Sequence, residues 1–215
     1  MKAIAKGAEP ASLTAHRLTP HCDYGNYAAK DDLRAYLLRE QGALCCYCMS
    51  RIHAAGRGMK IEHWHSQENH PREQLTYQNL LGGCMGGEGK PIALQHCDTR
   101  KGDTDIRFNP ANPAHRIETR ISYGSDGSIH SSDTIFDTQL NAVLNLNLAV
   151  IKNNRKGVLD ALLIWWKGEK QRVKGQVPKA LFERKLTHWS SETPDLTPYC
   201  QVAVWWLRVK LAGMA

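Results

Sequence analysis

Hydrophobic residues recur at helical spacing near both ends of the chain. In residues 30–41, Leu33 and Leu37 fall on one face with Tyr36, and Gly42 stands where a glycine commonly ends a helix. A shorter helix is expected to begin near residue 10, with leucines 13 and 18 on its apolar side. These patterns predict an N-terminal helical segment over residues 1–44.

The second helical pattern begins at Asp133. Its apolar stripe consists of Leu140, Val143, Leu144, Leu148 and Ile151. The stripe continues beyond Gly157 to residue 166, and Pro178 and Pro198 stand where the first turns of two further helices are expected. Five of the six tryptophans fall in this part of the chain, and we expect them to form the core of a helical subdomain instead of a base-stacking surface.

A β-hairpin is predicted between these helical regions. Residues 116–122 alternate between apolar and polar side chains, as a strand does, and Ser-Asp-Gly-Ser at 125–128 is typical of a turn before Ile129. The hairpin and the later helices together form a predicted third region, residues 111–215.

Residues 45–110 have few periodic runs and are rich in Gly, His and Cys. Gly82-Gly83 and Gly86-Gly87 indicate loops around Cys84. Such a block cannot bury much apolar surface by itself. A bound metal that supplies part of the folding free energy would explain how it holds its shape.

Composition indicates where the chain is located. The apolar share of 42% is typical of a globular chain, the first twenty residues lack an apolar leader, and no apolar run is long enough to span a bilayer. We therefore expect a cytoplasmic protein with no membrane association. Thiols stay reduced in that compartment, so the seven cysteines indicate metal binding before disulfides.

Four of these cysteines suit a structural Zn²⁺ ion. Cys45 and Cys48 have the two-residue spacing of a ligand half-site, and Cys84 and Cys97 would complete it across a glycine-rich insert. Cys46 can replace Cys45 only with a less usual spacing. A thioredoxin-like redox site is an alternative, but the sequence around Cys45 and Cys48 lacks the βαβ pattern of that fold. The other alternative is that the cysteines are buried free thiols. Zinc is the favoured interpretation, with Cys22 and Cys200 as ordinary buried thiols.

The charge favours an anionic partner. The net charge is +7 and the pI is near 9.1, so nucleic acid, either DNA or RNA, is the commonest such partner, although a merely basic enzyme also fits. Residues 152–185 contain ten Lys or Arg and three acids, a local balance of +7. This segment is either a face that follows phosphates or an ordinary solvated helix face.

The central block also has the residue types needed for phosphodiester hydrolysis. His63 suits a general base because imidazole titrates near neutral pH. Glu62 and Asp98 offer hard oxygen ligands for Mg²⁺ or Mn²⁺. Asn79 can orient the histidine through a backbone carbonyl, and Lys101, one helical turn after Asp98, can contact a phosphate.

One point of geometry stays open at this level. In a regular strand Glu62 and His63 point to opposite faces, whereas His63 and His65 share one face. Either the strand bends at His63, or His65 is the second residue on the metal side.

These motifs, in this order, resemble the HNH (ββα-metal) endonuclease family. The shared pattern is Cys-x-x-Cys, Glu-His, Asn-Leu-Leu, Cys and Cys-Asp-x-x-Lys-Gly. The resemblance implies His63 as the general base, Asn79 as the middle asparagine, Glu62 and Asp98 as ligands of the catalytic metal, and the four cysteines as the zinc site. Glu62 replaces a more usual Asp, Asp98 replaces a usual Asn or His, and an insert splits the second cysteine pair.

The likeness extends to the PtuB-type HNH proteins. It is carried by Gly-Ala-Glu-Pro-Ala-Ser-Leu at 7–13, Glu-Gln-Gly-Ala-Leu-Cys at 40–45 and Ile-Glu-His at 61–63, and it covers most of the first 130 residues. It implies an antiphage role in a Septu system, or in a retron with Septu-like effectors. The implied partners are a PtuA-type ATPase and, in a retron, a reverse transcriptase with its DNA.

The sequence therefore predicts an α+β protein in which a zinc-stapled ββα-metal HNH core is flanked by an N-terminal helical segment, a β-hairpin and a C-terminal helical subdomain. The predicted activity is metal-dependent hydrolysis of nucleic-acid phosphodiester bonds. The first alternative is a non-catalytic, zinc-stabilised nucleic-acid-binding adaptor. A Cys-x-x-Cys thiol oxidoreductase is the second.

Overall fold

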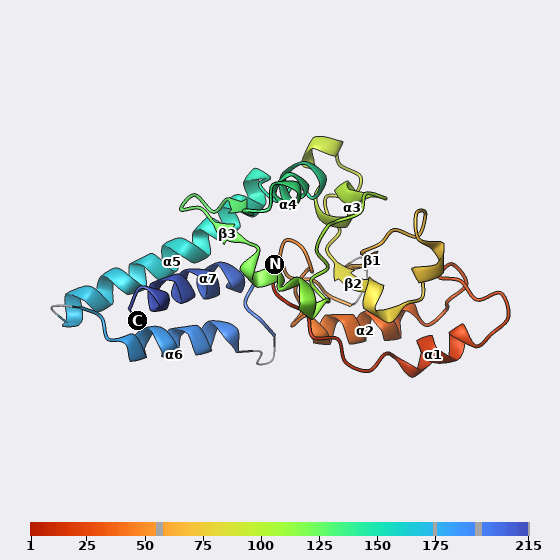
Figure 1. The fold of residues 1–215 in the computed structure, drawn as a ribbon, viewed down its shortest axis with the longest axis horizontal. Helices are drawn as coiled ribbons and strands as arrows, with labels where there is room; N and C mark the ends of the chain where they lie inside the picture. The colour runs from red at the N-terminus through yellow and green to blue at the C-terminus, as the bar shows by residue number, and fades with distance from the viewer. Residues whose placement is uncertain (55–57, 174–175, 192–194, 215) are drawn as a thin grey trace.

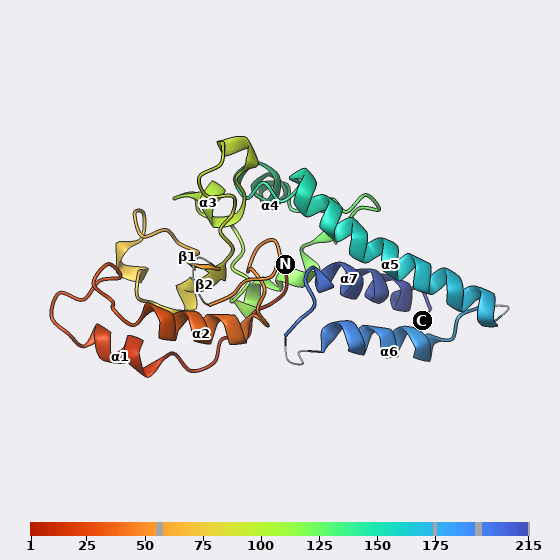
Figure 2. The same ribbon diagram turned by 180° about the vertical axis from the view of Figure 1, so that it is seen from behind.

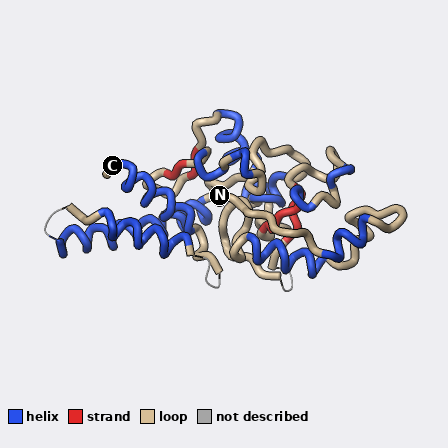
Figure 3. Tube along the Cα trace, turned by 60° about the horizontal axis from the view of Figure 1, so that its bottom comes forward, coloured by secondary structure: helices blue, strands red, loops and turns tan. Residues whose placement is uncertain are grey.

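The computed structural model describes residues 1–54, 58–173, 176–191 and 195–214. The molecule is elongated and has two lobes (Figures 1 and 2). We use "N-terminal lobe" for the described part of residues 1–110, and "helical lobe" for α5 (Ala149–Val173), α6 (Lys179–Ser190) and α7 (Cys200–Ala212). The fold is mixed α and β, and the strands of the described residues form two small sheets (Figure 3).

The N-terminal segment contains two helices, α1 (Ala11–Arg17) and α2 (Lys30–Glu40). Leu33 and Leu37 of α2 are fully buried, and Gly42 has a φ of +57°, so the expected glycine ending is confirmed. The prediction that Leu18 faces the apolar side is wrong. Its side chain is 83% exposed because α1 ends one residue earlier and turns Leu18 outward.

The central part is an antiparallel pair of strands followed by a short helix. Strand β1 (Lys60–His63) pairs with β2 (Leu80–Gly83), and α3 spans Cys97–Lys101. Three 3₁₀ turns lie between them, η1 (Pro71–Glu73), η2 (Tyr77–Asn79) and η3 (Ile92–Leu94). The buried Gln41 amide bonds both backbone groups of Gly82, at 2.6 and 2.8 Å, and so fixes the end of α2 against β2.

The predicted β-hairpin is present but much shorter than expected. Its strands are β3 (Ser122–Tyr123) and β4 (Ile129–His130), joined at the expected turn. The strand predicted over residues 116–122 is wrong for most of its length, because the chain there forms the 3₁₀ turns η4 (Pro113–His115) and η5 (Ile117–Thr119). Arg116 lies between them with a φ of +47°, which no strand allows.

The helical pattern after residue 133 is interrupted once. Asp133 caps α4 (Thr134–Thr138) by accepting a hydrogen bond from the Phe136 backbone, and a π-helical turn, η6 (Gln139–Val143), follows. The chain then turns at Asn145, whose φ is +49°, before α5 begins. The predicted stripe therefore spans two elements, although its residues Leu140, Leu144 and Ile151 are buried as expected.

The helical lobe is held by aromatic packing. Phe182 is fully buried, and its ring meets Trp165 edge to face at 5.7 Å. Trp166 and Trp206 meet in the same manner at 5.5 Å. Of the five tryptophans predicted to form the core of a helical subdomain, Trp206 is buried and the other four pack half-buried against the core, so the prediction is confirmed in part.

Backbone hydrogen bonds link the N-terminal lobe to the segments that precede α5 and α7. Leu196 N donates to Gly42 O at 3.1 Å, and Tyr199 N donates to Met49 O at 3.0 Å. Cys97 N donates to Leu144 O at 2.9 Å. Within the described ranges, no helix combines the length and apolar character needed to cross a bilayer.

Candidate functional site

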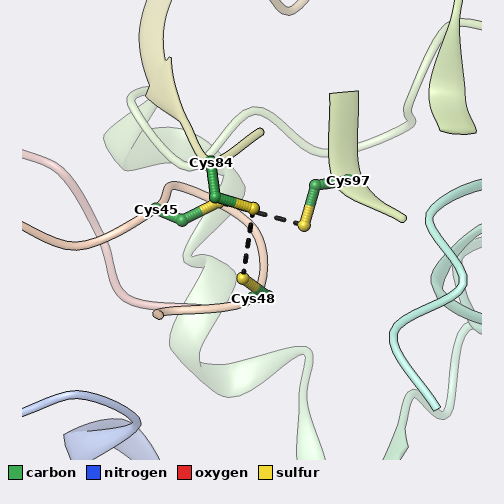
Figure 4. A group of neighbouring side chains, drawn as sticks. All are labelled: Cys45, Cys48, Cys84 and Cys97. Atoms are coloured by element: carbon green, nitrogen blue, oxygen red, sulfur yellow. Dashed lines mark hydrogen bonds between the residues drawn. The ribbon is translucent and has the colours of Figure 1, made fainter. Parts of the chain in front are cut away.

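Four cysteine side chains converge in the N-terminal lobe, and their sulfur atoms all lie within 4.8 Å of one another (Figure 4). Cys45 and Cys48 come from the loop after α2, Cys84 follows β2, and Cys97 begins α3. The Sγ atoms of Cys45 and Cys97 are 3.9 Å apart, and those of Cys48 and Cys84 are 3.7 Å apart. The cluster thus fastens three separate segments to one point.

The geometry of this cluster fits a tetrahedral zinc ion. Zinc–sulfur bonds of 2.3 Å place neighbouring sulfurs about 3.8 Å apart, close to the two distances in the cluster. Burial raises the pKa of a thiol, yet hydrogen bonds from neighbouring cysteines outweigh it at Cys45 and hold its pKa well below the usual range. The four residues can hold a metal ion such as zinc.

The structure also decides between the two neighbouring cysteines. Cys46 is buried outside the cluster, and its backbone N–H donates to Gly82 O at 3.0 Å. No sequence motif marks His96 as part of this site, yet its Nδ1 lies 3.2 Å from the Cys97 sulfur. A ring N–H at that position would stabilise a bound thiolate, as outer partners of metal ligands do. Of the two cysteines expected to be buried elsewhere, Cys200 is buried and Cys22 only partly so.

A second group of polar residues lies at the β1, β2 and α3 junction. Glu62 is 1% exposed, and its Oε1 accepts hydrogen bonds from Tyr47 at 2.7 Å and from the Lys101 ammonium at 3.0 Å. The Asp98 carboxyl group lies against Glu62. Gly83 lies between the two residues, because a Cβ atom placed on it would be 3.7 Å from the Cβ of each. Burial, followed by the proximity of Asp98, raises the pKa of Glu62 well above its usual range.

His63 ends β1 in a buried position beside this pair. Its Nε2 lies 3.0 Å from Gln74 O, and its ring meets Tyr24 edge to face at 4.5 Å. Burial lowers the pKa of His63 to about 4, so the imidazole is neutral at pH 7. It is also a weaker base than the near-neutral pKa expected from the sequence would make it.

The sequence left open whether Glu62 or His65 lies beside Asp98, and the end of β1 shows where each side chain points. Strand pairing stops at His63, and the chain bends at Trp64 and His65. The Glu62 side chain turns toward Asp98, whereas His65 stacks on Trp64 and contacts Glu73. Glu62 is thus the residue that shares a site with Asp98.

Asn79 fixes the bend after β1. Its side-chain oxygen accepts from His65 N at 2.7 Å, and its Nδ2 donates to His65 O at 3.0 Å and to Glu73 O at 3.2 Å. The side chain is 3% exposed, so these bonds form out of water. Asn79 therefore positions the backbone beside His63, in keeping with the orienting role predicted for it, although it contacts other carbonyls than that of His63.

Lys101 does not lie where a phosphate can reach it. Its side chain is 1% exposed, and its ammonium donates to His63 O at 2.9 Å besides pairing with Glu62. The predicted phosphate contact does not fit this placement. The more accessible cation is Lys60, 3.7 Å from Asp98 and 3.5 Å from Glu88, which the sequence analysis missed because strand alternation did not mark it.

The donor set of the second group suits a hard divalent cation. Glu62 is buried and Asp98 is half-buried beside it, so two carboxylates there would repel each other, and a cation between them would remove that repulsion. Oxygen ligands of this kind suit Mg²⁺ or Mn²⁺ better than a soft metal.

The basic segment is less free than its charge suggests. Arg155 is 2% exposed and bonds the carbonyls of Gly127 and Leu146. Other members pair with acids: Lys152 with Asp126, Lys156 with Asp160, and Arg172 with Glu169. Residue 174 lies outside the described residues. Part of the segment's charge is thus neutralised within the chain.

Comparison of the sequence with known proteins gives no family for this chain. No protein-family model matches the sequence, and none of the curated proteins matches it. The functional argument for this chain therefore rests on its own residues and on where the structure places them.

Proposed function

We propose that this chain is a metal-dependent endonuclease of the HNH type, which hydrolyses phosphodiester bonds in DNA or RNA. The observation that supports it best is that Glu62 of β1 lies against Asp98 of α3, with His63 next to Glu62 in the same strand. The four-cysteine cluster beside them would pin the same junction through a structural Zn²⁺ ion.

Each residue has a defined role in this proposal. His63 takes a proton from the attacking water, since its buried imidazole is neutral at pH 7. Glu62 and Asp98 would hold Mg²⁺ or Mn²⁺, which would stabilise negative charge on the phosphate and on the leaving oxygen. Asn79 positions the backbone beside the base, and Lys60 is the cation best placed to meet a phosphate.

The setting of the activity is part of the proposal. The resemblance to PtuB-type proteins supports an antiphage effector in the cytoplasm that acts with a PtuA-type ATPase, in a retron beside a reverse transcriptase and its DNA. The helical lobe offers a surface for such a partner, because Ile164 is 74% exposed and Val209 is 52% exposed.

A non-catalytic adaptor is the second candidate, and one contact favours it. Lys101 already neutralises Glu62 inside the protein, so the carboxylate can be structural without a cation. In that case the zinc-stabilised lobe would bind nucleic acid through exposed basic residues and would not cut it.

The test compares the wild-type protein with His63→Ala on plasmid DNA and on tRNA, with and without Mg²⁺, and with and without the ATPase. We expect Mg²⁺-dependent cleavage by the wild type and a loss of about 10²-fold or more in the variant, because the general base is removed. His130→Ala is the matched control, since this histidine is exposed on β4, far from the site in the sequence.

Two results would decide between the candidates, and one control is needed. Cleavage by His63→Ala at the wild-type rate rejects the mechanism. Binding of nucleic acid by the wild type without cleavage under every condition supports the adaptor. The control is zinc content, which must be equal in the wild type and both variants. Equal zinc shows that a loss of cleavage comes from the missing side chain and not from misfolding.

A further inference from the structure

A third group of metal-ligand side chains lies in the loop between β1 and β2, apart from the two groups above. It consists of His65, His70 and Glu73, whose ligand atoms all lie within 4.8 Å of one another. The three side chains are 27%, 30% and 43% exposed, so an ion can reach them from solvent. Neither the zinc cluster nor the proposed catalytic centre contains these residues.

The local fold brings the three together. After His65 the chain makes a turn held by Ser66, whose carbonyl accepts from His70 N at 2.9 Å. Pro71 then starts the 3₁₀ turn η1, which has three residues per turn. His70 and Glu73 therefore fall on the same side of that turn, and both face back toward His65.

Their contacts show a group that is already organised. The His65 ring stacks on the His70 ring at 4.2 Å with an interplanar angle of 19°. His65 Nδ1 donates to Glu73 Oε2 at 2.8 Å. His70 Nε2 donates to Asp105 Oδ2 at 2.9 Å, from the segment that follows α3.

We propose that His65, His70 and Glu73 form a second transition-metal site, with nitrogen and oxygen ligands suited to Zn²⁺, Co²⁺ or Ni²⁺. Two imidazoles and one carboxylate are a common ligand set for such ions. Donors about 2.0–2.1 Å from zinc lie about 3.4 Å from one another, so the present separations close with small rotations of exposed side chains. Asp105 acts as the outer carboxylate, which orients His70 through its Nε2–H and leaves Nδ1 free for the ion.

The site would brace the loop that holds the neighbouring polar residues. The Glu73 carbonyl accepts from Asn79, and the Gln74 carbonyl contacts His63. Asn69 of the same loop donates to Asp103 O at 2.7 Å, so the loop also touches the segment after α3. A metal on His65, His70 and Glu73 fixes these carbonyls, which makes its ligands positioning residues for His63. The metal site itself does not depend on the proposed nuclease activity.

The test is a titration of Co²⁺ into protein that is free of any histidine tag and has been dialysed against a weak chelator until one Zn²⁺ per chain remains. We expect one Co²⁺ per chain, seen as weak visible d–d absorption without a thiolate-to-metal charge-transfer band, because its ligands lack sulfur. Tryptophan emission should fall as Co²⁺ binds, since Trp64 stacks on His65 at 3.9 Å, and most of this fall should be lost in Trp64→Phe.

Variants assign the ion to its ligands. His70→Ala and Glu73→Gln should each abolish the stoichiometric Co²⁺ signal, and Asp105→Asn should weaken binding by about 10–100-fold, as loss of an outer carboxylate does. His130→Ala is the matched control, because His130 also lies near one carboxylate, 3.9 Å from Asp137, without a second histidine. It should bind Co²⁺ like the wild type.

Two results would overturn the site. One is the absence of a stoichiometric Co²⁺ signal in the wild type, and the other is wild-type affinity in His70→Ala and Glu73→Gln. Zinc content and circular dichroism unchanged in every variant would show that these outcomes do not come from misfolding. Loss of Co²⁺ binding and loss of nuclease activity are separate readouts, so either proposal can fail alone.

Discussion

The N-terminal lobe and the helical lobe are stabilised by different means. In the helical lobe, three helices of 12 to 25 residues bury an aromatic core in which Phe182 is fully enclosed. In the N-terminal lobe, the longest described helix has 11 residues, each strand has four, and α3 has five. Short elements of this kind have few hydrogen bonds of their own.

The difference lies in what joins the elements. The four-cysteine cluster connects the loop after α2, the end of β2 and the start of α3. Single buried side chains complete the network, Gln41 between α2 and β2 and Asn79 at the bend after β1. In the N-terminal lobe, a cluster able to hold a metal and single buried polar side chains therefore join the elements, whereas the helical lobe depends mainly on apolar and aromatic packing.

The largest expected effect is the loss of a zinc ligand. Cys97→Ser should reduce zinc from one ion per chain to almost none and unfold the region around β1 and β2. Structural zinc supplies on the order of 10 kcal/mol or more in zinc-finger peptides, comparable to the whole stability of a domain. Hydrogen exchange with mass spectrometry should show lost protection in β1, β2 and α3 and retained protection in α5 and α7.

Cys46→Ala provides the matched control, because Cys46 is equally buried and adjacent to the cluster but outside it. It should keep its zinc and its exchange pattern. If Cys97→Ser also kept the protection of β1 and β2, the cysteines would be ordinary packing residues and the contrast between the lobes would fail.

The next effect concerns the helical lobe. Phe182→Ala removes a fully buried ring that contacts Trp165, and it should lower the free energy of unfolding by roughly 3–5 kcal/mol. Zinc content should not change, because the ring is not part of the cysteine cluster. Urea denaturation followed by tryptophan emission measures the first quantity, and metal analysis measures the second.

Ile164→Ala is the control in the same lobe, since its side chain is 74% exposed and should change stability by less than about 0.5 kcal/mol. Loss of zinc from Phe182→Ala would mean that the two lobes fold as one unit and that their stabilities cannot be separated.

Sequence patterns predicted best what depends on neighbours in the chain. The spacing of Leu33 and Leu37 placed α2, and the prolines at 178 and 198 lie close to the starts of α6 and α7. The cysteine cluster could be predicted because a bound zinc ion needs four ligands, and the Cys45-x-x-Cys48 spacing is typical of half of such a set. The choice of Cys45 over Cys46 needed the structure only in part, because ligand spacing already favoured it.

What the sequence missed depends on tertiary contacts. Lys101 has the spacing of a phosphate ligand, but its position relative to Glu62 depends on how α3 docks against β1, and the structure buries it there. His70 and Glu73 come together only because η1 turns them back toward His65. The alternation at 116–122 predicted a strand, although it is equally compatible with successive 3₁₀ turns.

The smallest change in stability is expected from a buried cation. Each lobe has one such side chain, Lys6 in the N-terminal lobe and Arg155 in the helical lobe. In the N-terminal lobe, Lys6 donates to Leu80 O at 2.9 Å, pairs with Glu40 at 3.2 Å and lies over the Tyr77 ring. In the helical lobe, Arg155 of α5 bonds the carbonyls of Gly127 and Leu146. Only the lysine can lose its proton in an accessible pH range.

Burial lowers the pKa of Lys6 from 10.5 to about 8, despite the opposing effect of Glu40. Between pH 8 and pH 10.5 the unfolded chain therefore binds more protons than the folded one, and stability due to this group rises with pH. Below pH 8 both states are protonated and the full cost of burying the charge is present. Compared with Lys6→Met, the wild type should gain up to about 2 kcal/mol between pH 8 and pH 10 in urea denaturation. The remaining groups are the same in both proteins, so the difference between their pH profiles reports on Lys6. Equal profiles would contradict the prediction. They would mean that contacts with Glu40 and Tyr77 keep Lys6 protonated up to pH 10, as Arg155 is.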